Sequence, residues 1–216
     1  MTRPSRQVVV LGSTLLIAAI GALVVARSKP KAADLGFWFD TISIETTQSL
    51  PERLEGGITP VDMQTIEAVA IEEIRSAFSD FPVVLSSRRT ATYRVRVVEN
   101  LRHPMFPRMP APSGESRAIP GLGGQGAVNF RLLAHSAIMY APPDTERGAM
   151  VAAIGRGVGR AAVHEFAHQL LGSAPIHDSR DIQSYEYRSA DRREQYYGEL
   201  RWNIARPLLE KRFRLK

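Results

Sequence analysis

Apolar residues between positions 59 and 78 recur with the 3.6-residue period of an α-helix. Thr59 is a suitable N-cap, Pro60 suits the first helical position, and Asp62 falls in the first turn, where the helix dipole favours an acid. We therefore expect a helix that packs one face on a hydrophobic core. That face comprises Met63, Ile66, Ala70, Ile74, Ala77 and Phe78.

A two-residue period predicts strands at 81–86 and 91–99, with Tyr93, Val95 and Val97 on the buried side of the second. Short apolar runs predict two more strands, at 127–130 and 137–141. The stretch 102–126 is rich in proline and glycine, so we expect a long surface loop there. Its G-x-G-x-x-G run lacks the preceding strand of a dinucleotide site, and we reject that interpretation.

The longest predicted helix runs from about Glu146 to Leu171. Glycines at 155, 157 and 159 each lower its helix propensity by about 1 kcal/mol relative to alanine. Such a cost indicates that another element packs closely against them. The tail 189–216 is also expected to be helical and to kink or break at Pro207. Its apolar side comprises Tyr196, Leu200, Ile204 and Leu208.

Residues 8–26 are uncharged and mostly apolar. As a helix they would span about 28 Å, close to the roughly 30 Å hydrocarbon core of a bilayer. We expect a signal anchor (1–31), a linker (32–58) and one domain (59–216), with cleavage after Ala26 and secretion as the alternative. Positive charges flank the apolar segment equally, so the placement of the domain outside the cytoplasm rests on the usual behaviour of such anchors.

Composition narrows the classes of function. The 216 residues include no cysteine, which excludes disulfides, thiolate metal sites, iron–sulfur clusters and a cysteine nucleophile. The formal net charge of +6 favours acidic partners such as anionic lipid headgroups, but no feature indicates a specific nucleic-acid partner. The hydrophobic and charged fractions are those of a globular protein, and the predicted elements indicate the α+β class.

The candidate chemistry is concentrated at His164-Glu165-Phe-Ala-His168. Residues four apart on a helix project from one face, so the two imidazoles can reach one Zn²⁺ ion. Glu165 lies near enough to hold a water molecule and to act as general base without ligating the metal. Gly172 can end the helix and turn the chain back, which makes His177 the expected third ligand. Asp178 is an alternative to it.

This stretch resembles the metzincin clan of zinc peptidases, and matrixins within it. Their H-E-x-x-H-x-x-G-x-x-H pattern implies metal ligands at His164, His168 and His177 and the general base at Glu165. Gly172 is one residue late and His177 three residues late. Glu186 stands where the family has the methionine of its Met-turn. Asp181 and Tyr187 match an acidic residue and a tyrosine of the family segment, and Tyr187 is a candidate for oxyanion support.

The resemblance implies a zincin-like domain with a twisted mixed sheet, a backing helix and a long active-site helix. It also implies a zinc-dependent endopeptidase acting on peptides or proteins, with the strand at 127–131 as the edge that pairs with an extended substrate. In gluzincins the third ligand is a glutamate, which keeps Glu186, Glu194 and Glu199 open. The alternative functions are a zinc-stabilised, catalytically inactive, membrane-tethered binding module, or a basic membrane-surface protein with a chance motif and no metal.

Overall fold

The computed structural model describes residues 31–50, 53–101, 112–119, 122–172, 192–199 and 205–213. By its internal contacts the chain divides into two units, 1–31 and 32–216. The predicted anchor at 8–26 lies outside the described residues. Among the helices that are described, none combines the length and the apolar character needed to cross a membrane.

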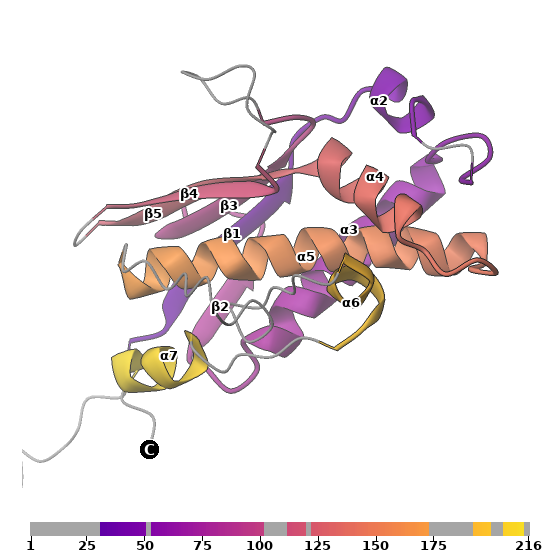
Figure 1. The fold of residues 1–216 in the computed structure, drawn as a ribbon. Coiled ribbons are helices and arrows are strands. Elements are labelled where there is room, and N and C mark those ends of the chain that lie inside the picture. Colours follow the sequence, from indigo (N-terminus) through magenta and orange to yellow (C-terminus); the bar gives the residue numbers. More distant parts are fainter. Residues whose placement is uncertain are drawn as a thin grey trace, which may run out of the picture. The chain divides into compact units, whose positions relative to one another are not determined.

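The second unit is an α+β domain built on a mixed five-stranded sheet (Figure 1). Its elements, in chain order, are β1 (Ala33–Phe39), α2 (Ile44–Gln48), α3 (Pro60–Ala77), β2 (Val83–Ser86), β3 (Tyr93–Val98), β4 (Gly114–Ile119), β5 (Gly123–Asn129), α4 (Phe130–Met139), α5 (Arg147–Leu171), α6 (Arg192–Tyr197) and α7 (Ala205–Phe213).

The strands lie in the order β2-β1-β3-β5-β4. All neighbours are parallel except β4, which runs antiparallel to β5 and forms one edge of the sheet. Side chains alternate across the sheet, as the pleat requires. Leu35, Phe37, Val95, Val97 and Val128 are buried on the face that α3 and α5 cover. The other face carries polar residues of the same strands.

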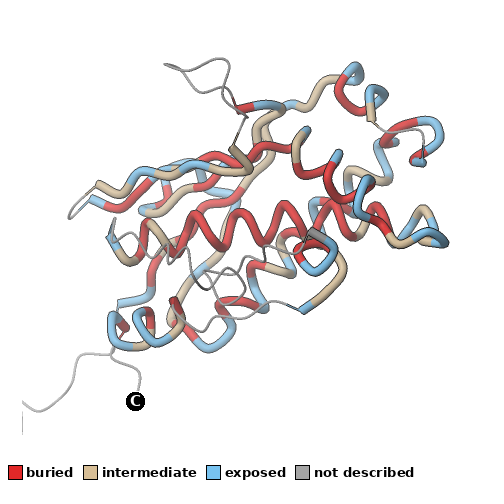
Figure 2. Tube along the Cα trace, in the orientation of Figure 1, coloured by how far each residue is buried: buried red, intermediate tan, exposed pale blue. Residues whose placement is uncertain are grey.

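Helix α5 is the centre of the domain. It packs on α3 and also on β3, β4, β5 and α4, and Figure 2 shows it buried over most of its length. Small residues allow this. At Gly155 a Cβ atom would lie 2.7 Å from the Cβ of Val69, and at Gly159 it would lie 2.7 Å from the carbonyl oxygen of Ala70. The predicted close approach to these glycines is confirmed, with α3 as the partner.

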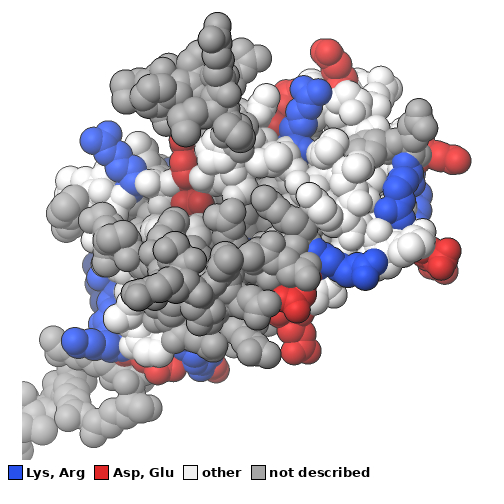
Figure 3. Space-filling model, in the orientation of Figure 1, with Lys and Arg blue, Asp and Glu red and all other residues white. Residues whose placement is uncertain are grey.

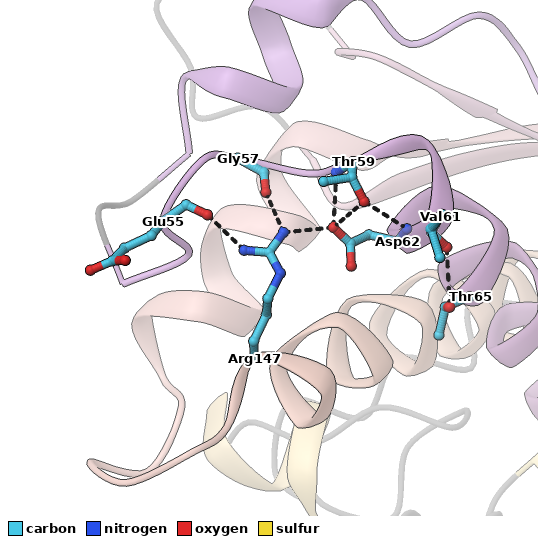
Figure 4. Close-up of polar contacts among 7 residues, drawn as sticks. All are labelled: Glu55, Gly57, Thr59, Val61, Asp62, Thr65 and Arg147. Carbon is cyan, nitrogen blue, oxygen red and sulfur yellow. Dashed lines mark hydrogen bonds and ion pairs between the residues drawn. The ribbon is translucent and has the colours of Figure 1, made fainter.

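The amino ends of α3 and α5 are joined through Arg147 (Figure 4). Its guanidinium donates hydrogen bonds to the carbonyl oxygens of Glu55 and Gly57 and pairs with Asp62 at 2.6 Å. The Asp62 carboxylate also accepts from the backbone N–H of Thr59, within the capping box that starts α3. The predicted N-terminus of this helix is therefore confirmed. A basic residue in the first turn of α5 is tolerated because a carboxylate faces it.

Two predicted irregular segments contain strands. The expected linker, 32–58, includes β1, which lies in the interior of the sheet between β2 and β3. The expected loop, 102–126, includes β4 and the first half of β5. The glycines of β4 and β5 suggest a loop by their composition, but Gly114, Gly124 and Gly126 lie where side chains of α5 approach the sheet too closely for a Cβ atom.

The predicted strand at 137–141 is wrong, because 137–139 belong to α4. The side chain of Asn129 accepts a hydrogen bond from the backbone N–H of Leu132 and so caps this helix. The apolar residues Leu133, Ala134, Ala137 and Ile138 are buried at helical spacing. In the described part of the tail, α6 and α7 are separate short helices. Pro207 lies in the first turn of α7, where a missing N–H leaves no hydrogen bond unmade.

Candidate metal centre

His164 and His168 lie one turn apart on the same stripe of α5. Their Nε2 atoms are 3.2 Å apart and the ring planes are nearly perpendicular, at 83°. Two nitrogens bound at roughly 2.0–2.1 Å to one ion and separated in this way subtend about 100° at the metal, close to the tetrahedral angle. His164 is buried, with 7% of its surface exposed, and His168 is half-buried. The pair therefore fits two positions of a zinc site.

Glu165 lies on the neighbouring stripe of α5, against the edge strand of the sheet. It is 5% exposed. A Cβ atom added at Gly114, the first residue of β4, would overlap the Glu165 carboxylate. Two residues along the strand, the hydroxyl of Ser116 donates a hydrogen bond to the backbone carbonyl of Glu165 at 3.3 Å. The edge strand thus passes directly over this carboxylate, and the glycine provides the space for it.

Gln169 fastens the histidine segment of α5 to the middle of the sheet. Its side-chain nitrogen donates to the carbonyl oxygen of Arg94 at 3.0 Å, and its side-chain oxygen accepts from the N–H of Arg94 at 3.1 Å. A Cβ atom at Gly124 would lie 2.7 Å from that of Gln169, and one at Gly126 would lie 3.0 Å from its amide nitrogen. These two glycines of β5 therefore make room for a buried polar side chain.

The opposite side of α5 is apolar. Val163, Phe166 and Leu170 are fully buried, and Phe166 packs edge-on against Phe78 with ring centroids 6.4 Å apart. The helix ends at Gly172, which adopts the left-handed conformation (φ 71°, ψ 66°) and donates its N–H to the carbonyl of His168. The predicted apolar back and the predicted glycine terminus are both confirmed.

Two turns upstream of the histidines, the same stripe of α5 is covered by α6. The ring of Tyr196 packs so closely on Gly157 that a Cβ there would lie 2.7 Å from its Cδ1. The close packing predicted at Gly157 is therefore confirmed, with this tyrosine as its partner. The sheet instead contacts the stripe that carries Glu165 and Gln169.

Arg160 holds α6 in this place. Its buried guanidinium pairs with Glu73 of α3 at 2.8 Å and donates to the carbonyl oxygens of Glu194, Gln195 and Gly198. Carbonyl groups at the end of a helix lack internal partners, and a cation is favoured there. One side chain therefore links α3, α5 and α6 one turn before His164.

The predicted third ligands divide into two groups. His177, Asp178 and Glu186 lie outside the described residues, as do Asp181 and Tyr187. Glu194 and Glu199 are exposed. Within the described part of the chain, no three or more His, Asp or Glu side chains form a group able to hold a metal ion. Glu194 and Glu199 are thus not brought together with the histidine pair.

Three residues of this site were not predicted. Gln169 is 2% exposed and follows His168 directly, and an uncharged polar residue at this point of a buried helix is the signal that indicates it. Gly114 lies in a segment that reads as a loop, so its position over Glu165 has no local signal. Arg160 reads as a surface arginine, because its partners are distant in sequence.

Comparison with protein-family models, curated proteins and solved structures gave no match.

Proposed function

We propose that this protein is a zinc-dependent endopeptidase with a zincin-like domain. The observation that carries the proposal is the 3.2 Å separation of the two Nε2 atoms on one stripe of α5, with the carboxylate of Glu165 buried on the adjacent stripe. Neutral imidazoles at this spacing are the donors that zinc prefers. A bound zinc ion supplies Lewis acidity, which polarises a scissile carbonyl and activates water.

Within this proposal, His164 and His168 hold the metal and Glu165 moves the proton. A carboxylate next to the metal accepts a proton from the attacking water and later passes it to the leaving amine. Glu165 suits this role because its side chain is confined between α5 and β4 and therefore has few alternative orientations. Closeness to the strand also limits the access of bulk water to the carboxylate.

We propose His177 as the third ligand, with Asp178 and Glu186 as the alternatives. Gly172 lies one helical turn beyond His168, and His177 is five residue steps further along the chain. Five extended residues span at most about 17 Å, while one turn of helix rises about 5.4 Å, so the chain is long enough to return to the histidine pair. The left-handed conformation of Gly172 supports a reversal of chain direction at this point.

The substrate-binding edge in this proposal is β4. We expected the strand at 127–131 to be the edge, but β5 lies between β3 and β4. No described strand pairs with the outer side of β4. An extended peptide added to such an edge makes main-chain hydrogen bonds along it. Because Gly114 lies over Glu165, a peptide paired with the start of β4 would pass close to the general base.

The proposed location is a membrane, with a single span at 8–26 and the peptidase domain outside the cytoplasm. The support is the length and apolar character of that segment. Alkaline extraction of cell membranes separates the two alternatives, because an anchored chain stays with the lipid whereas a chain cleaved after Ala26 is released. A protein that is found only in the cytosol would contradict both.

Metal analysis of the full-length chain tests the site. We expect about one zinc ion per chain, lost in His164→Ala and His168→Ala. His135→Ala is the matched control, because this histidine is exposed on α4. A zinc content that is unchanged in His168→Ala would refute the site. If His177→Ala lowers zinc affinity less than Glu186→Ala does, the ligand set is of the gluzincin type.

Glu165→Gln tests the chemistry separately from the metal. The amide keeps the size of the side chain but cannot accept a proton, so we expect full zinc occupancy and a loss of about 10²–10⁴-fold in peptide hydrolysis. Equal cleavage by both proteins would assign the activity to another group. A wild-type chain that binds zinc and cleaves none of a broad peptide mixture would favour the inactive binding module.

A further inference from the structure

The face of the sheet that turns away from α3 and α5 carries a groove of about 630 Å³. The register of β1, β3, β5 and β4 brings Trp38, Arg96 and Glu115 into one row across the sheet, with Arg94 and Arg117 in outward positions of the next row. The groove is separate from the candidate metal centre, which lies under the opposite face. Its lining includes Trp38, Arg89, Arg94, Arg96, Glu115 and Arg117.

The groove is basic. Four guanidinium groups line it, and Glu115 is the single carboxylate among its lining residues. Asp40 pairs with Arg96 at 3.3 Å and lies 4.0 Å from Arg89. Arg94 and Arg117 form no ion pair with any described residue. On the face shown in Figure 3, by contrast, the described basic and acidic side chains are intermixed around the margin.

Arg94 has an unsatisfied hydrogen-bond donor at the groove. Its Nε is buried and makes no hydrogen bond within the described structure, while one terminal nitrogen donates to the carbonyl of Arg89 at 3.4 Å. A buried donor without an acceptor is costly, and such groups are rare in folded proteins. Both backbone polar groups of Arg94, its N–H and its C=O, are hydrogen-bonded to the side-chain amide of Gln169. The backbone that carries this guanidinium is therefore fixed relative to α5.

Trp38 and Arg89 form a wall of the groove. The guanidinium carbon of Arg89 lies 5.6 Å from the centre of the Trp38 ring, and the ring N–H donates to Asp40. This stacking holds the positive charge of Arg89 beside the groove without neutralising it. The volume also lies in the usual range for small-molecule sites, about 300–1,000 Å³.

We propose that this groove binds a ligand that carries a phosphate group. The planar fork of a guanidinium matches the oxygens of phosphate, and convergent arginines are the usual means of holding that group. Arg94 on β3 supplies a buried donor, and Arg117 on the edge strand β4 supplies a positive charge that no described residue pairs. The phosphate belongs either to a free small molecule or to a lipid headgroup. The proposal does not rest on the peptidase function.

Isothermal titration calorimetry of the full-length chain in a non-ionic detergent tests the proposal at about 0.1 M chloride, where weak surface attraction is screened. One arm uses inorganic phosphate and the other uses glycerophosphoglycerol, the headgroup of an anionic lipid. We expect saturable binding in at least one arm, with a dissociation constant of about 1 mM or lower. The arm that binds more tightly identifies the source.

Two variants of the groove and one control make the result specific. Arg94→Gln and Arg117→Gln should each weaken binding by about tenfold, because each removes a charge-assisted contact. Arg75→Gln should leave the affinity unchanged, since Arg75 is exposed on α3 away from the groove. Arg117 is exposed on an edge strand, so its variant remains informative if Arg94→Gln does not fold. Absence of saturable binding in both arms, or wild-type affinity in Arg117→Gln, would overturn the proposal.

Discussion

The side-chain amide of Gln169 forms hydrogen bonds with both backbone polar groups of Arg94, on a strand 75 residues earlier in the chain. A helix can roll and slide on a sheet when only apolar side chains separate them. Here two directional bonds fix the rotation of α5 at the residue next to His168. Together with the hydrogen bond from Ser116 to the carbonyl of Glu165, this link positions His164, Glu165 and His168 relative to β4.

We predict that Gln169→Leu destabilises the domain by about 2–4 kcal/mol, because two buried backbone groups of Arg94 lose their partners. Urea unfolding followed by circular dichroism measures this change. Gln64→Leu is the matched control, since Gln64 is exposed on α3. Equal effects of the two substitutions would show that the Gln169 bonds contribute no stability.

Gly114→Ala should reduce peptide hydrolysis while zinc content and folding are retained. The new Cβ would overlap the Glu165 carboxylate, and the flexible end of that side chain is the part that must move. If Glu165 is the general base, as proposed, its displacement lowers the rate of hydrolysis, and we expect a loss of about tenfold or more. Hydrolysis at fixed zinc occupancy is the measurement. Wild-type kcat in this variant would contradict the proposed role of Glu165 as general base.

Two glycines of α5 should respond in opposite directions to alanine. At Gly148 an added Cβ meets no atom within 4 Å, so Gly148→Ala should stabilise the domain by up to about 1 kcal/mol through helix propensity. At Gly155 the added atom would lie 2.8 Å from the carbonyl oxygen of Ile66, so Gly155→Ala should cost about 1–3 kcal/mol. Thermal unfolding of both variants gives the comparison. Stabilisation by Gly155→Ala would mean that α3 and α5 are less tightly packed.

The Asp62–Arg147 cluster predicts a specific loss of stability in acid. Burial alone would raise the pKa of Asp62, but hydrogen bonds from Thr59 and Arg147 outweigh it and hold the pKa below its ordinary value. A carboxyl with a lowered pKa stabilises the fold above its unfolded pKa, and this contribution is lost as the pH falls through the folded pKa.

The stability difference between wild type and Asp62→Asn should therefore be largest above about pH 4 and should shrink at lower pH. Urea midpoints measured at neutral pH and at successively lower values give the profile. Glu67→Gln, at an exposed position on α3, serves as the control. A difference that is independent of pH would show that the charge of Asp62 does not contribute.

The sequence predicts the elements whose signals are local. The capping box at Thr59 and Asp62, the helical period of α3 and the long helix that ends at Gly172 depend on neighbouring residues alone. The position of His164, Glu165 and His168 on a buried helix follows from the same signals. These three residues could be identified as candidates because they are close in sequence, so that helix geometry alone places them together.

The remaining features depend on contacts between distant segments. Gly114 and Gly124 lower the strand propensity of their segments, so β4 and β5 could not be predicted from local sequence. Their glycines are explained by Glu165 and Gln169, which lie against them in the folded domain. The apolar run 137–141 is too short for its pattern to distinguish a strand from a helix. The N-cap at Asn129 favours the helix. The groove around Arg94 requires the register of four strands, which single-strand patterns do not contain.

The attachment of α6 by Arg160 has a consequence for the segment 173–191. Gly172, the residue before this segment, ends α5. The next described helix after the segment, α6, is bound to α5 through Tyr196 and Arg160. Both ends of a nineteen-residue stretch are thus tied to one helix, on either side of the histidine pair. A donor group on so short a tether has an effective concentration of about a millimolar or more at the histidines. For the zinc site proposed above, with its third ligand in this segment, a donor of weak intrinsic affinity would suffice, and substitutions at Arg160 should lower metal affinity without touching the metal.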